Sequence, residues 1–143
     1  MLWSDAWILL ATVYAAGKES ASLDEVIGAA DYIQHAIVTF EEMEGALDRL
    51  TTGDFIVFSN GRLSPSQKTL EYYESISKQK RRVLDEQQNI EDFIGAQRWQ
   101  PGDDPTQANK GASFPDLDRS EFDAAIQAYI SKAEKIIERI MKK

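Results

Sequence analysis

Apolar residues recur every three or four positions in three successive segments of the first third of the chain. This spacing predicts helices over residues 4–16, 22–33 and 39–52. Each segment opens on a hydroxyl residue that can cap a helix, and in two of them a glutamate three positions later completes a capping box. The capping residues are Ser4, Ser22 with Glu25, and Thr39 with Glu42.

The pattern changes from helical spacing to alternation at residues 54–64. An Asn-Gly pair at 60–61, between extended residues, favours a two-residue type I′ turn, because both positions must adopt positive φ. Counting outward from the turn pairs Phe58 with Leu63, and strand alternation places Ile56 on the same face. We therefore expect a hairpin with this apolar face buried.

Helical spacing returns after the Ser-Pro pair at 64–65, where Pro65 suits the first position of a helix. The apolar positions up to residue 98 predict one long helix, or two helices joined near the polar stretch at 77–82. Residues 99–119 contain three of the four prolines and little periodicity. This stretch is predicted to be a linker or long loop, mobile and with few buried contacts between residues 100 and 116.

The last segment, residues 120–143, is the clearest helix in the sequence. Its apolar positions are spaced alternately four and three apart, as in a coiled-coil seam. The seam consists of Phe122, Ile126, Tyr129, Ala133, Ile136 and Ile140, widened by Ile130, Ile137 and Met141. We expect it to pack on the helix that follows the hairpin and to form much of a homodimer interface. The alternative is that the whole stripe packs within one chain.

The order of these elements, helix, helix, helix, hairpin and helix, resembles the winged-helix superfamily. The likeness covers about residues 3–77 and includes Leu63-Ser64-Pro65, which is similar to the exit from the wing in PadR-like and MarR-like regulators. The resemblance implies that residues 39–52 occupy the recognition position and that residues 54–64 form the wing. It also implies DNA binding and dimerisation through added helices, which many members of the superfamily show.

The expected fold class is therefore mainly α: a winged helix-turn-helix of three helices plus a β-hairpin, with a long C-terminal helical extension. The expected divisions of the chain are a winged-helix domain at 1–77, a helical extension at 78–98, a linker at 99–119 and an amphipathic helix at 120–143.

Charge argues against DNA binding by the predicted recognition helix. The net charge of the chain is −8, and residues 1–53 carry nine acids against two bases. Removing the expected buried positions leaves an outer surface of Glu41, Glu42, Glu44, Gly45, Asp48 and Arg49. Such a surface repels phosphates, and neutralising phosphates supplies most sequence-independent affinity for DNA.

A few basic residues elsewhere are the candidate contacts to nucleic acid or another anion. They are Arg62 at the hairpin and Lys78, Lys80, Arg81 and Arg82 in the polar stretch at 77–82. A solvated turn residue and a solvated helix face, with Asp85 and Glu86 as ion-pair partners, are the alternative readings.

Catalytic and metal-binding patterns are scarce. The chain has no cysteine and a single histidine, His35, and it contains neither a nucleophile elbow, nor H-E-x-x-H, nor a phosphate-binding glycine loop. We therefore expect no catalytic residues, no metal and no cofactor. With no apolar run of membrane-spanning length, the chain is expected to be cytoplasmic and not to enter a membrane.

The function predicted from the sequence is a non-catalytic winged-helix regulatory or protein-interaction module, dimeric and with a further protein partner. The alternative is a DNA-binding transcriptional regulator. These two predictions differ in the surface presented by residues 39–52 and 54–64.

Overall fold

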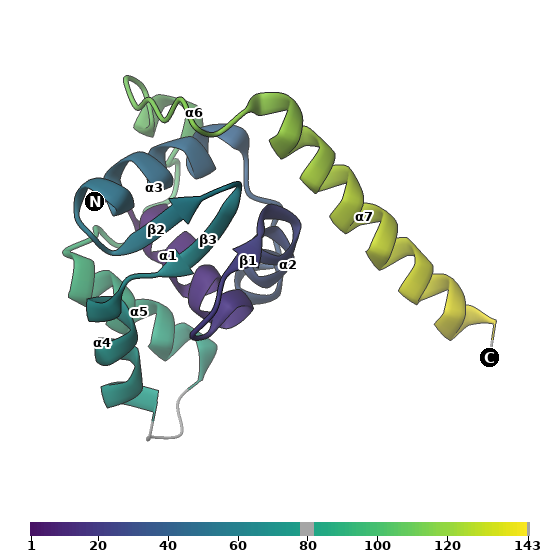
Figure 1. Cartoon of the computed structure of the whole chain (residues 1–143), viewed down its shortest axis with the longest axis horizontal. Coiled ribbons are helices and arrows are strands. Elements are labelled where there is room, and N and C mark those ends of the chain that lie inside the picture. Colours follow the sequence, from purple (N-terminus) through teal and green to yellow (C-terminus); the bar gives the residue numbers. More distant parts are fainter. Residues whose placement is uncertain (78–81, 143) are drawn as a thin grey trace.

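A computed structural model describes residues 1–77 and 82–142 of the chain. The fold is mainly helical and contains one small antiparallel sheet (Figure 1). The elements of the first part are α1 (Trp3–Ala16), β1 (Ala21–Ser22), α2 (Leu23–Gln34), α3 (Phe40–Thr52), β2 (Ile56–Ser59) and β3 (Arg62–Pro65). They are followed by α4 (Gln67–Ser77), α5 (Val83–Ile94), α6 (Pro105–Ala108) and α7 (Arg119–Met141).

The three strands lie in the order β1-β3-β2, so the hairpin gains a third, two-residue strand that precedes α2. The predicted register is confirmed, with Phe58 opposite Leu63 across the hairpin. The predicted turn is also confirmed, because Asn60 has a φ of 53° and Gly61 a φ of 74°. Leu63 is fully buried and faces the helical core.

Helix α1 is the centre of the fold. It contacts α2, α3, α5 and β3, and every residue from Ser4 to Val13 is buried. Ser4 is not the N-cap, so that prediction is wrong: the helix begins one residue earlier, and the carboxylate of Asp5 accepts the Leu2 N–H at 2.8 Å. Burial on all sides makes α1 a core helix rather than a surface helix.

Both predicted capping boxes are present. The Glu42 carboxylate accepts the Thr39 N–H at 3.0 Å, and the Thr39 hydroxyl accepts the Glu42 N–H at 3.2 Å. In the other box the Ser22 N–H donates to Glu25 at 3.1 Å. These caps start α2 and α3 where the sequence predicts.

Two helices, α4 and α5, follow the hairpin. Stacking of Tyr72 on Phe93, with ring centroids 4.1 Å apart, joins α4 to α5. Ile90 is fully buried and Ile94 nearly so, and α5 packs against α1. The helical extension is thus part of the core.

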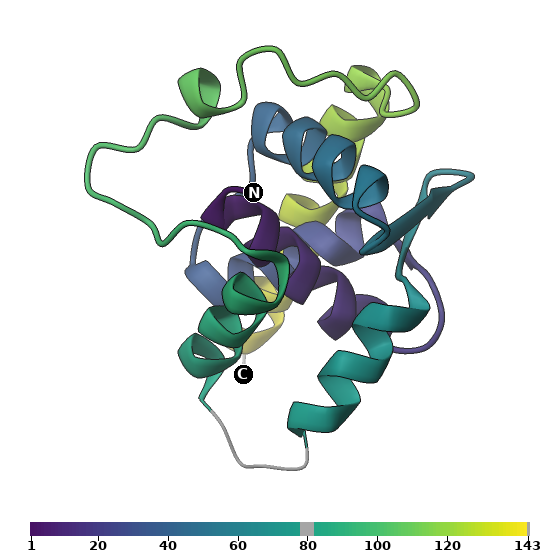
Figure 2. The same cartoon turned by 90° about the vertical axis from the view of Figure 1, so that its left-hand side faces the viewer.

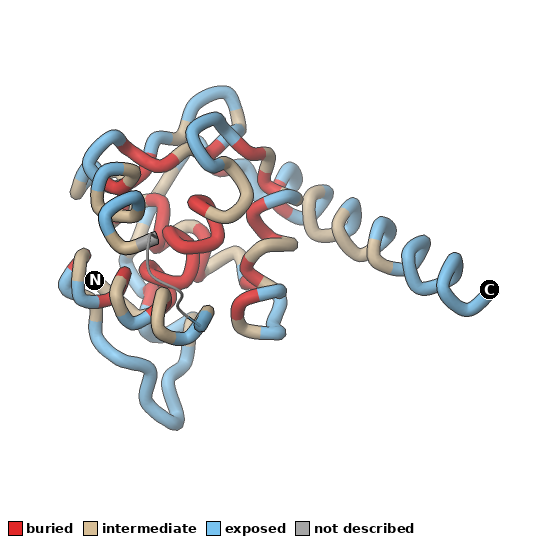
Figure 3. Tube along the Cα trace, turned by 90° about the horizontal axis from the view of Figure 1, so that it is seen from below, coloured by how far each residue is buried: buried red, intermediate tan, exposed pale blue. Residues whose placement is uncertain are grey.

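Helix α7 packs against α2 and then extends away from the body of the protein (Figures 1 and 3). The expectation that it packs on the helix following the hairpin is wrong. Gly28 leaves space for the ring of Tyr129, because a Cβ at that position would lie 3.0 Å from the ring. The Tyr129 hydroxyl donates to Asp31 at 2.5 Å. The absence of a side chain at Gly28 therefore allows α7 to lie close to α2.

Candidate interaction surfaces

The outer face of α3 is partly covered by the segment between α5 and α7. This segment, residues 99–118, is called the strap below. In Figure 2 the strap runs along the top of the view, above α3, and its short helix α6 contacts α3. Phe114 packs edge-on against Phe58, with ring centroids 5.3 Å apart, and Leu117 is buried.

Asn109 is the main polar anchor of the strap. Its side chain is buried, its Nδ2 donates to the carbonyl of Pro105 at 2.7 Å, and its Oδ1 accepts from Arg49 at 2.5 Å. A Cβ at Gly45 would lie 1.9 Å from that Oδ1, so a larger residue at position 45 would displace the Asn109 side chain. The expectation of few buried contacts between residues 100 and 116 is wrong at Asn109.

Arg49 connects the strap to the core. Its guanidinium makes a bidentate ion pair with Asp5, at 2.7 Å and 2.9 Å, and the Asp5 side chain is fully buried. A guanidinium that donates two parallel hydrogen bonds to one carboxylate forms a strong ion pair with a defined geometry. The only basic side chain of α3 is therefore committed to an internal carboxylate and is not part of an anion-binding surface.

The predicted outer surface of α3 needs correction at three positions. Glu42, Gly45 and Arg49 were expected to face solvent, but Glu42 and Gly45 are buried and Arg49 is ion-paired. Burial raises the pKa of Glu42 above its ordinary value, although the hydrogen bonds from Thr39 act in the opposite direction. Helical periodicity could not predict the burial of α3 by the strap, because the strap residues that contact α3 lie more than 50 positions further along the chain.

The candidate anion contacts do not form a cluster among the described residues. Arg62 donates to the hydroxyl and the carbonyl of Ser20, both at 2.9 Å, so it joins the hairpin to the turn before β1. Arg82 is exposed and lies 3.5 Å from Asp85. The other predicted contacts, Lys78, Lys80 and Arg81, lie outside the residues that the structure describes.

The second half of α7 carries an apolar stripe that the described part of the chain leaves uncovered. Phe122 is buried, and Ile126, Tyr129, Ile130 and Ala133 are partly buried. Beyond them the exposed fraction rises to 56% at Ile136, 55% at Ile137, 68% at Ile140 and 80% at Met141. The predicted seam thus divides into an intramolecular half and an exposed half.

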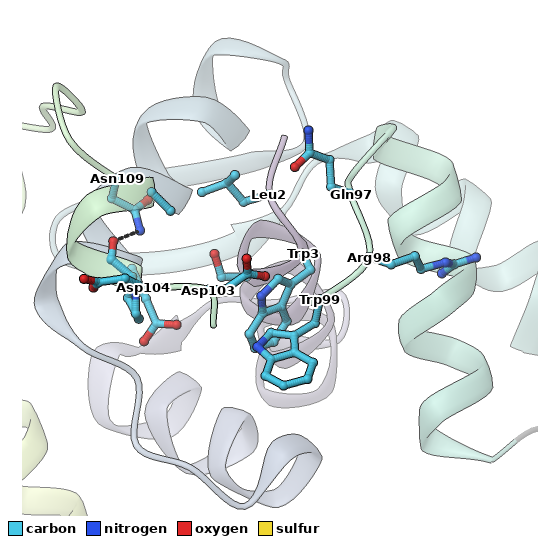
Figure 4. Close-up of a pocket in the computed structure, with 12 residues that line it drawn as sticks. Leu2, Trp3, Gln97, Arg98, Trp99, Asp103, Asp104 and Asn109 are labelled. Carbon is cyan, nitrogen blue, oxygen red and sulfur yellow. Dashed lines mark hydrogen bonds between the residues drawn. The ribbon is translucent and has the colours of Figure 1, made fainter. Parts of the chain in front are cut away.

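Two pockets share Trp3, Arg98 and Trp99 in their walls. The first has a volume of about 160 Å³ and lies between the N-terminus of α1, α3 and α6; its polar lining includes Glu42, Asp103 and Asp104. Figure 4 shows the two indoles lying together and Arg98 pointing away from them. Arg98 is paired with Glu91 at 3.2 Å and with Asp92 at 3.1 Å, both on α5.

The second pocket is larger, about 510 Å³, and lies between α1, the end of α2 and α5. Glu91 lines it, and burial raises the pKa of this carboxyl, against the lowering effect of Arg98. The sequence did not predict either pocket. The one available signal was Trp99, a large aromatic residue in an otherwise polar stretch.

The described residues contain no group of three or more acidic or histidine side chains that could hold a metal ion. No helix among them is both long and apolar enough to cross a membrane. No protein-family model matches the chain, and neither curated proteins nor solved structures give a match.

The strap gives a direct prediction. Gly45→Ala should displace Asn109 and increase the rate of proteolytic cleavage within the strap about fivefold, the effect of losing one hydrogen bond. Limited proteolysis with mass spectrometry measures this rate, with Glu44→Ala on the same helix as the control. Equal cleavage rates for the two variants would show that Asn109 does not hold the strap.

Proposed function

We propose that this chain is a winged-helix protein that acts as a non-catalytic regulatory or protein-interaction module and forms a homodimer. Support for the winged-helix part comes from the order α1-β1-α2-α3-β2-β3 and from the three-stranded sheet formed by β1 and the hairpin. In this proposal α3 is the recognition-position helix and the β2-β3 hairpin is the wing.

The position of the strap on α3 is the observation that supports a non-DNA-binding function. A recognition helix must enter the major groove with its side chains free to contact base edges. Here the strap lies on α3 through Asn109, and Arg49 is paired with Asp5. The remaining charged residues of the helix are acidic, at Glu41, Glu42, Glu44 and Asp48.

The exposed half of α7 is the proposed surface for a second copy of the chain. Four large apolar side chains between Ile136 and Met141 are each more than half exposed. A twofold axis brings the same stripe of two copies together, so one amphipathic helix can cover its own counterpart. Burial of this stripe supplies the driving force for association.

Duplex binding tests the proposal against the DNA-binding alternative. We expect fluorescence anisotropy with a labelled random-sequence duplex to show no saturable binding at physiological salt, because α3 is acidic and partly covered by the strap. Any binding at low salt should disappear when Lys78, Lys80, Arg81 and Arg82 are replaced by serine, since phosphate contacts come from basic side chains.

A variant with Lys110, Lys135, Arg139 and Lys142 replaced by serine is the matched control, because it removes the same charge elsewhere. It should bind as the unmodified protein does. Tight binding at physiological salt would instead identify a DNA-binding regulator and overturn the proposed function.

A further inference from the structure

The smaller of the two pockets contains a buried carboxylate without a cationic partner. Glu42, on α3, lines this pocket and is only 6% exposed. Its Oε1 accepts both hydrogen bonds that Thr39 donates, whereas its Oε2 accepts none from the described residues and retains accessible surface. A buried charge that no cation balances costs free energy. A cation in the pocket would lower this cost, and it need not touch one particular oxygen, because a full charge acts over several ångströms.

Two further carboxylates, Asp103 and Asp104 of the strap, line the same pocket. Each accepts one backbone N–H from the strap itself, at 2.8 Å and 3.0 Å. Among the described residues, no lysine or arginine forms an ion pair with either of them or with Glu42. The basic residue of the wall, Arg98, is already paired with two acids of α5. The wall of this pocket is therefore negatively charged.

Two indoles, those of Trp3 and Trp99, complete the wall. Figure 4 shows them together with Asp103 and Asp104 around the pocket. Trp3 stacks on Trp7, with ring centroids 5.7 Å apart, and the Trp7 Nε1 is fixed by donating to the carbonyl of Ala30 at 2.8 Å. The face of an indole carries partial negative charge and attracts cations more strongly than other aromatic rings do. Aromatic rings and carboxylates in one wall thus favour the same kind of occupant.

The size of the pocket restricts this occupant to a compact cation. Its volume of about 160 Å³ is larger than the share of a single water and smaller than the pockets that hold drug-sized molecules. The described residues contain no group of acidic or histidine side chains that could hold a metal ion. An ammonium group carrying methyl groups suits this wall better, because its methyl groups can contact the indoles while its charge is balanced by the carboxylates.

We propose that this pocket binds a methylated ammonium group. Trp3 and Trp99 contact the methyl groups, and the negative charge of the wall balances the ammonium. Because the wall is built from α1, α3 and the strap, the occupant also holds the strap against α3. This site goes beyond the proposed function: binding of the cation requires neither a second copy of the chain nor the absence of DNA binding, so either proposal can fail alone.

A matched pair of probes tests the site. Choline and the neutral dimethylbutanol in which a carbon atom replaces its nitrogen have the same shape and differ in charge. We expect choline to bind with a dissociation constant on the order of 1 mM. The neutral probe should bind about tenfold more weakly, because it lacks the attraction to the indoles and the carboxylates. Protein-observed NMR titration of the full chain at constant ionic strength measures both affinities.

Two variants locate the binding. Glu42→Gln removes the buried charge but keeps a residue type that completes the capping box of α3, so choline should bind at least tenfold more weakly and the neutral probe equally well. Trp99→Leu should weaken choline about fivefold by removing an indole. Since Trp99 is 53% exposed, this variant retains the fold.

Glu44→Gln is the matched control. Glu44 is also an acidic residue of α3, but it is not part of the pocket wall. This control should keep the affinity for choline and the preference over the neutral probe. Equal affinities for the two probes in the unmodified protein, or chemical-shift changes with choline no larger than those with sodium chloride, would overturn the proposal. An equal loss in Glu42→Gln and Glu44→Gln would also overturn it, since the binding would then lie elsewhere.

Discussion

Replacing Arg49 by methionine is expected to lower the free energy of unfolding by about 3 kcal/mol. Asp5 is fully buried, and the substitution would leave its carboxylate without a cationic partner in the centre of the fold. The expected loss is at the lower end of the usual range for breaking a buried pair, because the Arg49 side chain is 25% exposed and water can enter the vacated space. Urea denaturation followed by tryptophan fluorescence measures the change.

A double variant separates the charge from the packing. Asp5→Asn combined with Arg49→Met removes the unpaired charge while leaving an oxygen for the Leu2 N–H, so it should recover most of the lost stability. Arg62→Met, which removes an exposed arginine bound to Ser20, is the control and should cost less than about 1 kcal/mol. A loss for Arg49→Met no larger than this control would contradict the assigned role of the pair.

If the proposed homodimer forms, replacing Ile137 by aspartate is expected to convert it into a folded monomer. In a dimer formed through α7 the isoleucine side chain is buried, which contributes about 1.5–3 kcal/mol for each copy. The new carboxylates would also lose their hydration in an apolar interface. The dimer dissociation constant should therefore rise at least on the order of a thousandfold. Light scattering at high micromolar concentration measures the mass of both proteins.

Ser131→Asp provides the control for the dimer. Ser131 is an exposed polar position of the same helix, outside the apolar stripe, so this variant should keep the mass of the unmodified protein. Because Ile137 is 55% exposed within one chain, circular dichroism should report an unchanged helix content for Ile137→Asp. A monomeric mass for the unmodified protein would exclude the proposed interface.

Sequence patterns predicted several local features of this fold correctly, since each depends on residues a few positions apart. Two local predictions are wrong: Ser4 does not cap α1, which begins at Trp3, and Pro65 belongs to β3 instead of starting a helix. The turn at Asn60-Gly61 has the positive φ angles that its residue types favour, and the register of the hairpin follows from it. The capping box of Thr39 and Glu42 starts α3. The acidic character of α3 is likewise a property of the sequence alone.

Contacts between distant residues were decided only by the tertiary structure. Asp5, Arg49 and Asn109 are connected by hydrogen bonds, yet none of them has a neighbour in sequence that indicates its partner. The ring of Tyr129 on α7 packs into the space left at Gly28, and the Asn109 side chain of the strap packs into the space left at Gly45.

The candidate sites also combine features that the sequence predicts with features that only the tertiary structure decides. An apolar stripe along residues 122–141 is evident in the sequence, because helical periodicity is local. Which half of the stripe is covered depends on the packing of α7 against α2, which the sequence pattern does not indicate. Sequence thus determined the helices, the turn and the charge of each face, whereas packing between distant segments decided which faces remain accessible. The physical reason is that caps and turns depend on the backbone of a few adjacent residues, while burial depends on complementary shapes brought together by the whole chain.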